Sequence, residues 1–183
     1  MKAIFAADMR RRWLVFGGLA VLVVIADQIS KLWVDANFAL ASARGSGAGL
    51  TAPSPILGDF VRVAKSYNDG GLFGLFGTAA PVLAVASVVV IALLVYTQWR
   101  TGSEGTILST IALGLLLGGA LGNFFDRIRL GFVIDWVDTG IGDLRWYTFN
   151  VADAAISLSI IGLVLAAFLP ARPAAHEPAE AGR

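Results

Sequence analysis

The chain has 183 residues, of which 57% are hydrophobic and only 15% are charged. Soluble domains carry about 25% charged residues. This composition excludes a disordered chain, a nucleic-acid-binding arm and a free cytosolic enzyme, and it indicates a membrane protein. The net charge of +1 provides no field that would attract a polyanion. We therefore expect a single membrane domain over residues 1–183, without a nucleic-acid partner.

The residue types that are missing narrow the possible chemistry. The absence of cysteine excludes disulfides, thiol nucleophiles and iron–sulfur clusters. The only histidine, His176, lies in a Pro/Ala-rich stretch, which argues against a Ser-His-Asp triad or an HExxH zinc site. Because metal and nucleotide signatures are also missing, we expect no cofactor. The ten aspartates remain as the main candidates for acid–base chemistry.

Four apolar segments approach the length of about 20 residues that a membrane helix needs. They cover residues 13–34, 77–99, 105–126 and 151–169. The segments 35–76 and 127–150 would be extracytoplasmic, and the tail 171–183 is predicted to be disordered. Four crossings place both termini on the same side of the membrane. The sequence thus predicts an all-α polytopic membrane protein with four transmembrane helices.

The first extracytoplasmic segment has two parts of different character. Residues 41–58 are rich in Gly, Ala, Ser and Pro, which is typical of a flexible loop. Residues 60–64 alternate apolar and polar side chains, which is a weak strand signal. We therefore expect a small β-containing segment between the first and second helices. Tyr67–Gly71 is predicted to form a tight turn, and Asp138 and Asp143 are interpreted as loop residues.

The distribution of charge suggests an orientation. Lys and Arg number seven on each side, but Arg10–Arg12 directly precede the first span and favour a cytoplasmic N-terminus. Nine of the ten aspartates fall on the other side. Basic residues followed by a 14-residue apolar run and Val24-x-Ala26 also resemble a cleavable signal peptide. Against that alternative, Asp27–Lys31 continues the helical pattern without a turn signal.

Ionisable residues gather at one end of the predicted spans, where they cost several kcal/mol unless they are paired or face water. Asp27 and Lys31 are spaced i, i+4 and can form an ion pair on one helix face. Asn123, Asp126 and Arg127 form a second polar face at the end of the third span. A helix-end salt bridge and a helix cap would explain these residues without any catalytic role.

The fourth span opens with Asn150 and Asp153, which suit the N-cap and N3 positions of a helix. Asp135 is different, because it lies in the apolar run Val133–Val137 without a basic neighbour. A strand or loop residue that points at water would also explain it. Glycine at every fourth position of the third span indicates close helix packing at Gly114, Gly118 and Gly122.

Together these residues resemble the lipoprotein signal peptidase family, also called signal peptidase II. Asp27–Lys31 is similar to its D-x-x-[ST]-K block, and Asn68–Phe73 is similar to N-x-G-x-x-F. Gly118–Val137 resembles G-G-A-x-G-N-x-x-D-R…G-x-V-V-D-F, and Phe149–Asp153 resembles F-N-x-A-D. The order and spacing agree from residue 13 to about 168. Trp136 stands where the family usually has Phe.

The resemblance implies a membrane aspartic endopeptidase that removes the signal peptide from prolipoproteins by cleaving before the diacylglyceryl-modified cysteine. It implies that Asp135 and Asp153 are the catalytic pair. It also implies supporting or substrate-binding roles for Asp27, Lys31, Asn68, Gly70, Asn123, Asp126, Arg127, Asn150 and Ala152. We expect a monomer in the cytoplasmic membrane, with its active site at the extracytoplasmic face and with prolipoproteins and membrane lipids as partners.

The residues support this chemistry, and they leave alternatives open. Two nearby carboxylates that share one proton can activate water and protonate a leaving nitrogen. Asp153 at a helix N-terminus would be biased toward the ionised form, and Asp135 in apolar surroundings toward the protonated form. A transporter or assembly factor could use the aspartates as an ion path. A Ser/Lys protease could use Ser30–Lys31 or Lys65–Ser66, and an inactive family member is a third alternative.

Overall fold

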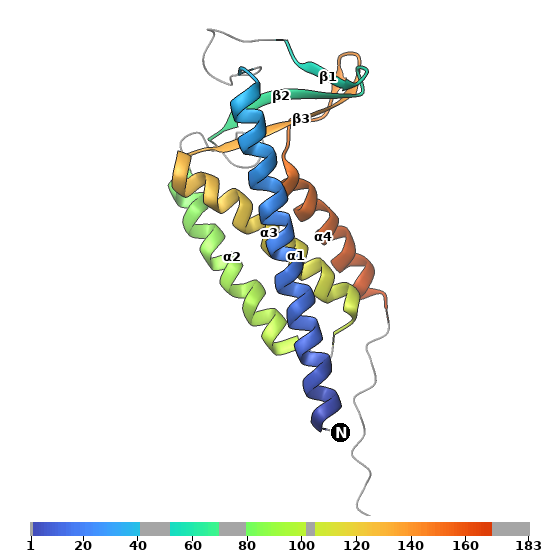
Figure 1. The fold of residues 1–183 in the computed structure, drawn as a ribbon. Helices are drawn as coiled ribbons and strands as arrows, with labels where there is room; N and C mark the ends of the chain where they lie inside the picture. Colours follow the sequence, from blue (N-terminus) through green and yellow to red (C-terminus); the bar gives the residue numbers. More distant parts are fainter. Residues whose placement is uncertain (1, 41–51, 70–79, 102–104, 170–183) are drawn as a thin grey trace, which may run out of the picture.

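The computed structural model describes residues 2–40, 52–69, 80–101 and 105–169, and it contains a helix bundle with a small sheet across one end (Figure 1). The helices are α1 Lys2–Asn37, α2 Ala80–Thr101, α3 Ile107–Leu130 and α4 Val151–Ala167. The strands are β1 Ser54–Leu57, β2 Val61–Asn68, β3 Val133–Ile141 and β4 Leu144–Arg145, paired antiparallel in that order.

Each of the four predicted apolar segments contains a helix. Among the described residues, α1, α2 and α3 are long and apolar enough to cross a membrane, and α4 is a shorter apolar helix of 17 residues. The structure therefore confirms the helices, while the crossing by α4 and the cytoplasmic location of both termini stay predictions. The helix α1 runs without interruption through Asp27–Lys31, as the helical pattern there predicts.

The helix α3 does not end at residue 126. It continues to Leu130 and ends at Gly131, whose φ of 79° allows the left-handed cap in which its N–H bonds the Arg127 carbonyl oxygen. Asp126 and Arg127 therefore lie in the last turns of the helix, and their backbone positions are fixed by helical hydrogen bonds. The polar face expected from their spacing is confirmed, but it lies inside the helix end.

The helix α3 is the centre of the bundle and packs against the other three helices. Its glycines make this possible, as their spacing predicts. A Cβ atom added at Gly118 would lie 2.6 Å from the Val23 Cβ on α1, and one added at Gly119 would lie 2.6 Å from the Ala152 carbonyl oxygen on α4. Gly122 is equally close to its neighbours, because a Cβ atom added there would lie 2.7 Å from an Asp27 carboxylate oxygen.

Gly118→Ala is expected to lower the free energy of unfolding by about 1–3 kcal/mol, the usual cost of overpacking a filled interior. The matched control is Gly18→Ala on α1, where an added Cβ meets nothing within 4 Å. That change is expected to stabilise the helix by about 0.5–1 kcal/mol through helix propensity. Thermal unfolding in detergent compares the two variants. Equal midpoints would contradict the close α1–α3 contact.

The sheet corrects three expectations. The chain is not all-α outside segment 35–76, because β3 and β4 come from segment 127–150 and β3 pairs with β2. The strand β1 also lies inside the 41–58 stretch that was predicted to be a loop. Asp143 is in the turn between β3 and β4, as expected, but Asp138 is a buried residue of β3 and not a loop residue. The pairing of β2 with β3 is non-local, so no local pattern announces it.

Two ion-pair groups hold the sheet in place. The register of β2 against β3 shifts between Val63 and Ser66, a bulge that re-aims the side chains around it. Lys65 in this bulge is buried, and its Nζ lies 2.6 Å from Asp35 Oδ1 at the end of α1. Asp138 binds Arg62 of β2 at 2.6 Å and Arg145 of β4 at 3.0 Å. The sheet is thus tied to α1 and cross-linked across three strands.

Candidate active site

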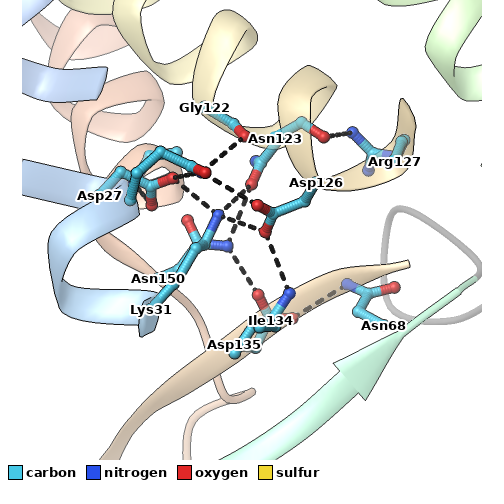
Figure 2. A network of polar contacts seen from close by, with 12 residues as sticks. Asp27, Lys31, Asn68, Gly122, Asn123, Asp126, Arg127, Ile134, Asp135 and Asn150 are labelled. Carbon is cyan, nitrogen blue, oxygen red and sulfur yellow. Dashed lines mark hydrogen bonds and ion pairs between the residues drawn. The ribbon is translucent and has the colours of Figure 1, made fainter. Parts of the chain in front are cut away.

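Asp135 lies on β3 where the strand passes the helix ends, and its side chain is 4% exposed. One carboxylate oxygen accepts a hydrogen bond from Asn150 Nδ2 at 2.7 Å, and the other accepts one from Asn68 Nδ2 at 3.0 Å (Figure 2). Burial raises the pKa of Asp135 to about 7, the negative charge of Asp153 adds to that increase, and the two asparagines oppose it. Asp135 is therefore a carboxyl group that can hold a proton near neutral pH.

Asp153 is fixed by the start of α4. Asn150 is the N-cap of this helix, and its side-chain oxygen accepts from the Asp153 N–H at 2.9 Å. The Asp153 carboxylate accepts in return from the Asn150 N–H at 3.3 Å, which completes the capping box expected from the sequence. Asn123 Nδ2 on α3 donates to the other Asp153 oxygen at 2.7 Å. The local cap and the packed helix together set the direction of this carboxylate.

Asn150 connects the two aspartates. Its Nδ2 donates to Asp135, its Oδ1 receives the Asp153 N–H, and it is fully buried. The same Nδ2 also lies 3.1 Å from Asn123 Oδ1. Asp135 lies on β3 and Asp153 on α4. The Asn150 side chain nevertheless bonds to the Asp135 carboxylate and to the backbone N–H of Asp153. The structure thus brings together the two aspartates that the resemblance singles out.

A buried ion cluster lies beneath this pair. Lys31 Nζ is 2.8 Å from Asp27 Oδ2 on its own helix and 2.8 Å from Asp126 Oδ2 on α3, and all three side chains are 0% exposed. Lys31 Nζ also donates to Asn123 Oδ1 at 3.2 Å, so the cluster contacts the asparagine that donates a hydrogen bond to Asp153. The i, i+4 pair predicted for Asp27 and Lys31 is confirmed, and Asp126 is an additional partner.

The carboxylates of this cluster also accept hydrogen bonds from backbone N–H groups. Asp27 Oδ1 accepts from the Ala152 N–H at 3.0 Å, in the first turn of α4. Asp126 Oδ2 accepts from the Ile134 N–H at 3.2 Å, directly before Asp135. The cluster therefore connects α1, α3, α4 and β3, and it places the backbone on which both candidate catalytic residues stand. Figure 2 shows these contacts converging between the helix ends and β3.

Gln28 belongs to this network, although sequence reasoning assigned it no role. Its Nε2 lies 2.9 Å from Asp126 Oδ1, 3.1 Å from Asp27 Oδ2 and 3.3 Å from the Gly122 carbonyl oxygen. Adjacent residues on a helix point in different directions. The position of Gln28 directly after Asp27 therefore does not predict that the two side chains contact the same partner. The only signal was its place inside the Asp27–Lys31 block, because the contact itself depends on the approach of α3.

The remaining predicted site residues have different outcomes. Arg127 Nη1 donates to the Asn123 carbonyl oxygen on its own helix at 3.4 Å. Gly70 lies outside the described residues. Among those described, no group of three or more His, Cys, Asp or Glu side chains could hold a metal ion.

The geometry does not support a Ser/Lys nucleophile. Ser30 Oγ donates to the Asp27 carbonyl oxygen at 2.8 Å, whereas Lys31 Nζ binds two carboxylates. Lys65 is bound to Asp35 through both its carboxylate and its backbone oxygen. A general base must reach the proton that it removes. Each lysine is instead engaged with an acidic partner.

Comparison with known proteins agrees with this geometry. Residues 19–169 match the family model described as signal peptidase (SPase) II. The chain is 40% identical over 163 residues to a lipoprotein signal peptidase of Methylorubrum extorquens, covering 85% of this chain and 86% of that protein. It is 34% identical over 160 residues to one of Moorella thermoacetica, covering 87% of this chain and 97% of the relative.

The fold also matches solved structures. One, described as a bacterial membrane enzyme determined by the in meso method at 2.3 Å, has a TM-score of 0.70 and 26% identity, with 81% of this chain and 84% of that chain covered. A second, at 1.9 Å, has a TM-score of 0.69 and 25% identity, with 82% and 90% covered.

The membrane-length helices and these matches define the chain as a multi-pass membrane protease. It belongs to the lipoprotein signal peptidase (signal peptidase II) family, which removes signal peptides from lipoproteins in the bacterial cytoplasmic membrane.

Proposed function

We propose that Asp135 and Asp153 form a catalytic dyad that cleaves a prolipoprotein before its diacylglyceryl-modified cysteine. One observation carries this proposal: Asn150 donates to the Asp135 carboxylate and caps the backbone of Asp153, so both side chains are held at the junction of β3 and α4. Asn68 and Asn123 each orient one of the two carboxylates from another element. This arrangement supplies two positioned carboxyl groups. The Ser/Lys alternatives lack such an arrangement, because Lys31 and Lys65 are bound to carboxylates.

The two aspartates take different parts in the reaction. Asp153 removes a proton from the attacking water, and Asp135 protonates the scissile carbonyl oxygen. When the resulting diol collapses, Asp153 passes its proton to the leaving nitrogen and Asp135 recovers its own. The division follows from the surroundings. Asp135 is buried with a pKa of about 7. Asp153 is half-buried at a helix N-terminus, and its carboxylate accepts two hydrogen bonds, from Asn123 Nδ2 and from the Asn150 N–H.

The location of the dyad favours hydrolysis over ion transport. A transporter places its binding residues near the middle of the membrane, whereas Asp153 is in the first turn of α4 and Asp135 is on a strand beyond the helices. We infer that this end of the bundle is the extracytoplasmic face. There a monomer would meet a scissile bond that is held at the membrane surface by its diacylglyceryl anchor.

The experiment that tests the substrate is a cleavage assay with purified protein in lipid. The substrate is a prolipoprotein carrying diacylglyceryl on its cysteine, and the matched control is the same precursor without the lipid. We expect cleavage of the modified precursor at the bond before the cysteine, and little or none of the control. Equal cleavage of both precursors would contradict the lipid requirement, and cleavage of neither would favour a transporter or an assembly factor.

The rate of cleavage is expected to fall as the pH rises through about 7, the value to which the pKa of Asp135 is raised. The protonated carboxyl is the form that donates to the substrate, and it is lost above this pKa. The dependence of kcat/KM on pH between pH 5 and 9 measures this loss of activity, since kcat/KM reports the ionisation of the free enzyme. A rate that is constant from pH 6 to 9 would contradict the assignment of Asp135 as the acid.

The same group affects stability with a defined sign. The pKa of Asp135 is raised from 3.8 to about 7, so the folded protein binds a proton that the unfolded chain releases within this window. The free energy of unfolding therefore decreases as the pH rises from about 4 to about 7 and levels off above that range. In Asp135→Asn this contribution is absent, so its unfolding midpoint should depend less on pH.

A further inference from the structure

One end of the sheet carries a group of exposed large apolar side chains. This end, which we call the tip, consists of the β1–β2 turn and the β3–β4 hairpin. Its apolar side chains are Ile56, Leu57, Phe60, Ile141, Leu144 and Trp146, and their exposed fractions range from 54% for Phe60 to 84% for Leu144. Contiguous apolar surface outside the helix bundle indicates contact with a partner or with a membrane.

The tip is a rigid unit. The Gly140 N–H donates to the Phe60 carbonyl oxygen at 3.0 Å, so the two turns are bonded directly to each other. Arg145 donates to the Asp59 carbonyl oxygen at 2.6 Å, and the Gly142 N–H donates to the Asp59 carboxylate at 2.8 Å. Since backbone and side chains of the tip are occupied with one another, its apolar side chains are held outward and do not fold back on the sheet.

Four of the five charged residues of the tip neutralise one another, and the fifth is Asp143, which is exposed in the β3–β4 turn. Asp59 and Asp138 each pair with Arg62 and Arg145, and these four residues form one connected set. The set has two carboxylates and two guanidinium groups, so it adds no net charge. Paired charges of this kind can enter the headgroup layer of a bilayer at a lower cost than single ones.

The chain keeps the tip close to the membrane. Trp146 is four residues before Asn150, the N-cap of the apolar helix α4. Four extended residues reach at most about 14 Å, so Trp146 lies near the level at which α4 begins. Figure 1 shows the β1–β2 turn and the β3–β4 connection reaching sideways beyond the start of α4, on the side of the sheet that faces away from the helix bundle.

We propose that the tip is a membrane anchor that inserts into the headgroup region of the leaflet on the sheet side, next to α4. Such insertion typically places apolar side chains about 5–10 Å into the boundary between headgroups and acyl chains. Trp is enriched at this level, where its ring is apolar and its N–H meets polar groups. The apolar surface of the tip would thus continue the lipid-facing surface of α4, on which Leu158 and Ile161 are exposed.

Two features favour lipid over a protein partner. The consecutive residues Ile56 and Leu57 are both more than half exposed, as are Ile141 and Leu144 on either side of the hairpin turn. Apolar side chains therefore surround the tip, whereas a protein partner would bury one face and leave the others in water. Lipid surrounds an inserted segment on all sides. If the dyad proposed above is correct, the anchor also holds β3, and with it Asp135, at a fixed height above the bilayer.

The absence of cysteine allows a direct test, because each introduced cysteine is the only site for a nitroxide label. The test variants are Leu144→Cys and Trp146→Cys at the tip. The reference for lipid is Ile161→Cys on α4, and the reference for water is Asn37→Cys at the end of α1, both at exposed positions. Each labelled protein is placed in vesicles of phosphatidylcholine and phosphatidylglycerol, and collisions with oxygen and with a water-soluble nickel chelate are measured by electron paramagnetic resonance.

We expect the ratio of oxygen to chelate collisions at both tip positions to be severalfold higher than at Asn37 and to approach that at Ile161. An unchanged unfolding midpoint shows that each variant is folded, and all four positions are exposed, so the fold should be retained. A ratio at the tip equal to that at Asn37 would overturn the proposal. Dipolar broadening between tip labels would also overturn it, because a second copy of the chain would then cover the tip. The result does not depend on the dyad, since no step of it measures cleavage.

Discussion

Asp135→Asn and Asp153→Asn are each expected to reduce the rate of prolipoprotein cleavage by about 10²–10⁴-fold, the usual contribution of a positioned acid or base. The change replaces a carboxyl by an amide of nearly the same size. An oxygen remains to accept from Asn150 or Asn123, so one of the two hydrogen bonds that hold each side chain can persist, while the new amide nitrogen replaces the oxygen that accepted from Asn68 or from the Asn150 N–H. The amide cannot exchange a proton with water or with the leaving nitrogen. Single-turnover cleavage of the lipid-modified precursor measures the loss.

The matched control is Asp143→Asn, the same chemical change at an exposed position in the β3–β4 turn. It is expected to leave the rate unchanged. Unfolding midpoints of all three variants separate loss of chemistry from loss of structure. If either dyad variant kept near-wild-type activity, its role in the reaction would be wrong, while membership of the family would be unaffected.

Lys31→Met is expected to lower the free energy of unfolding by about 3–5 kcal/mol, because it breaks a buried ion cluster by removing one partner. Met keeps the approximate length and the apolar stem of the side chain but provides no ammonium group. Asp27 and Asp126 would then face each other without a cation, and both are 0% exposed. Their bonds to the Ala152 and Ile134 N–H groups are too few to replace the lost charge. Thermal or denaturant unfolding in detergent measures the effect.

The control for this change is a neutral cluster, Asp27→Asn/Lys31→Met/Asp126→Asn. Replacing all the ions of a buried group is often close to neutral in stability, whereas removing one is costly. The triple variant is therefore expected to recover a large part of the loss. Should Lys31→Met alone unfold within about 1 kcal/mol of the wild type, the cluster would have the low energy of a surface salt bridge and would not be the foundation of the site.

Local patterns in the sequence determined the helices and several of their details. Hydropathy located four helical segments, since every residue of a membrane helix makes its backbone hydrogen bonds within the same segment. The Asn150–Asp153 cap and the Asp27–Lys31 pair were predictable for the same reason, because three or four positions along a helix fix a shared face. The glycine spacing of α3 likewise indicated a close contact, although not which helix would fill it.

The resemblance of four blocks to a known family singled out candidate site residues but not their arrangement. It named Asp135 and Asp153 without showing that Asn150 connects them. It also gave no role to Gln28, whose contact with Asp126 on α3 exists only because two helices cross at Gly122. The order of the four blocks along the chain indicated the family, whereas the contacts between their residues are known only from the folded chain.

Only the tertiary structure decided how the strands of segments 35–76 and 127–150 pair. The strand β3 has no local signal that selects β2 as its partner, since their paired residues Ser66 and Asp135 are far apart in the chain. Asp138 looked like a loop residue for the same reason, because its buried position depends on Arg62 of another strand. Helical contacts repeat at short intervals and leave a pattern in the sequence. Pairing between distant strands leaves none, and at this site it is that pairing which brings Asn68 to Asp135.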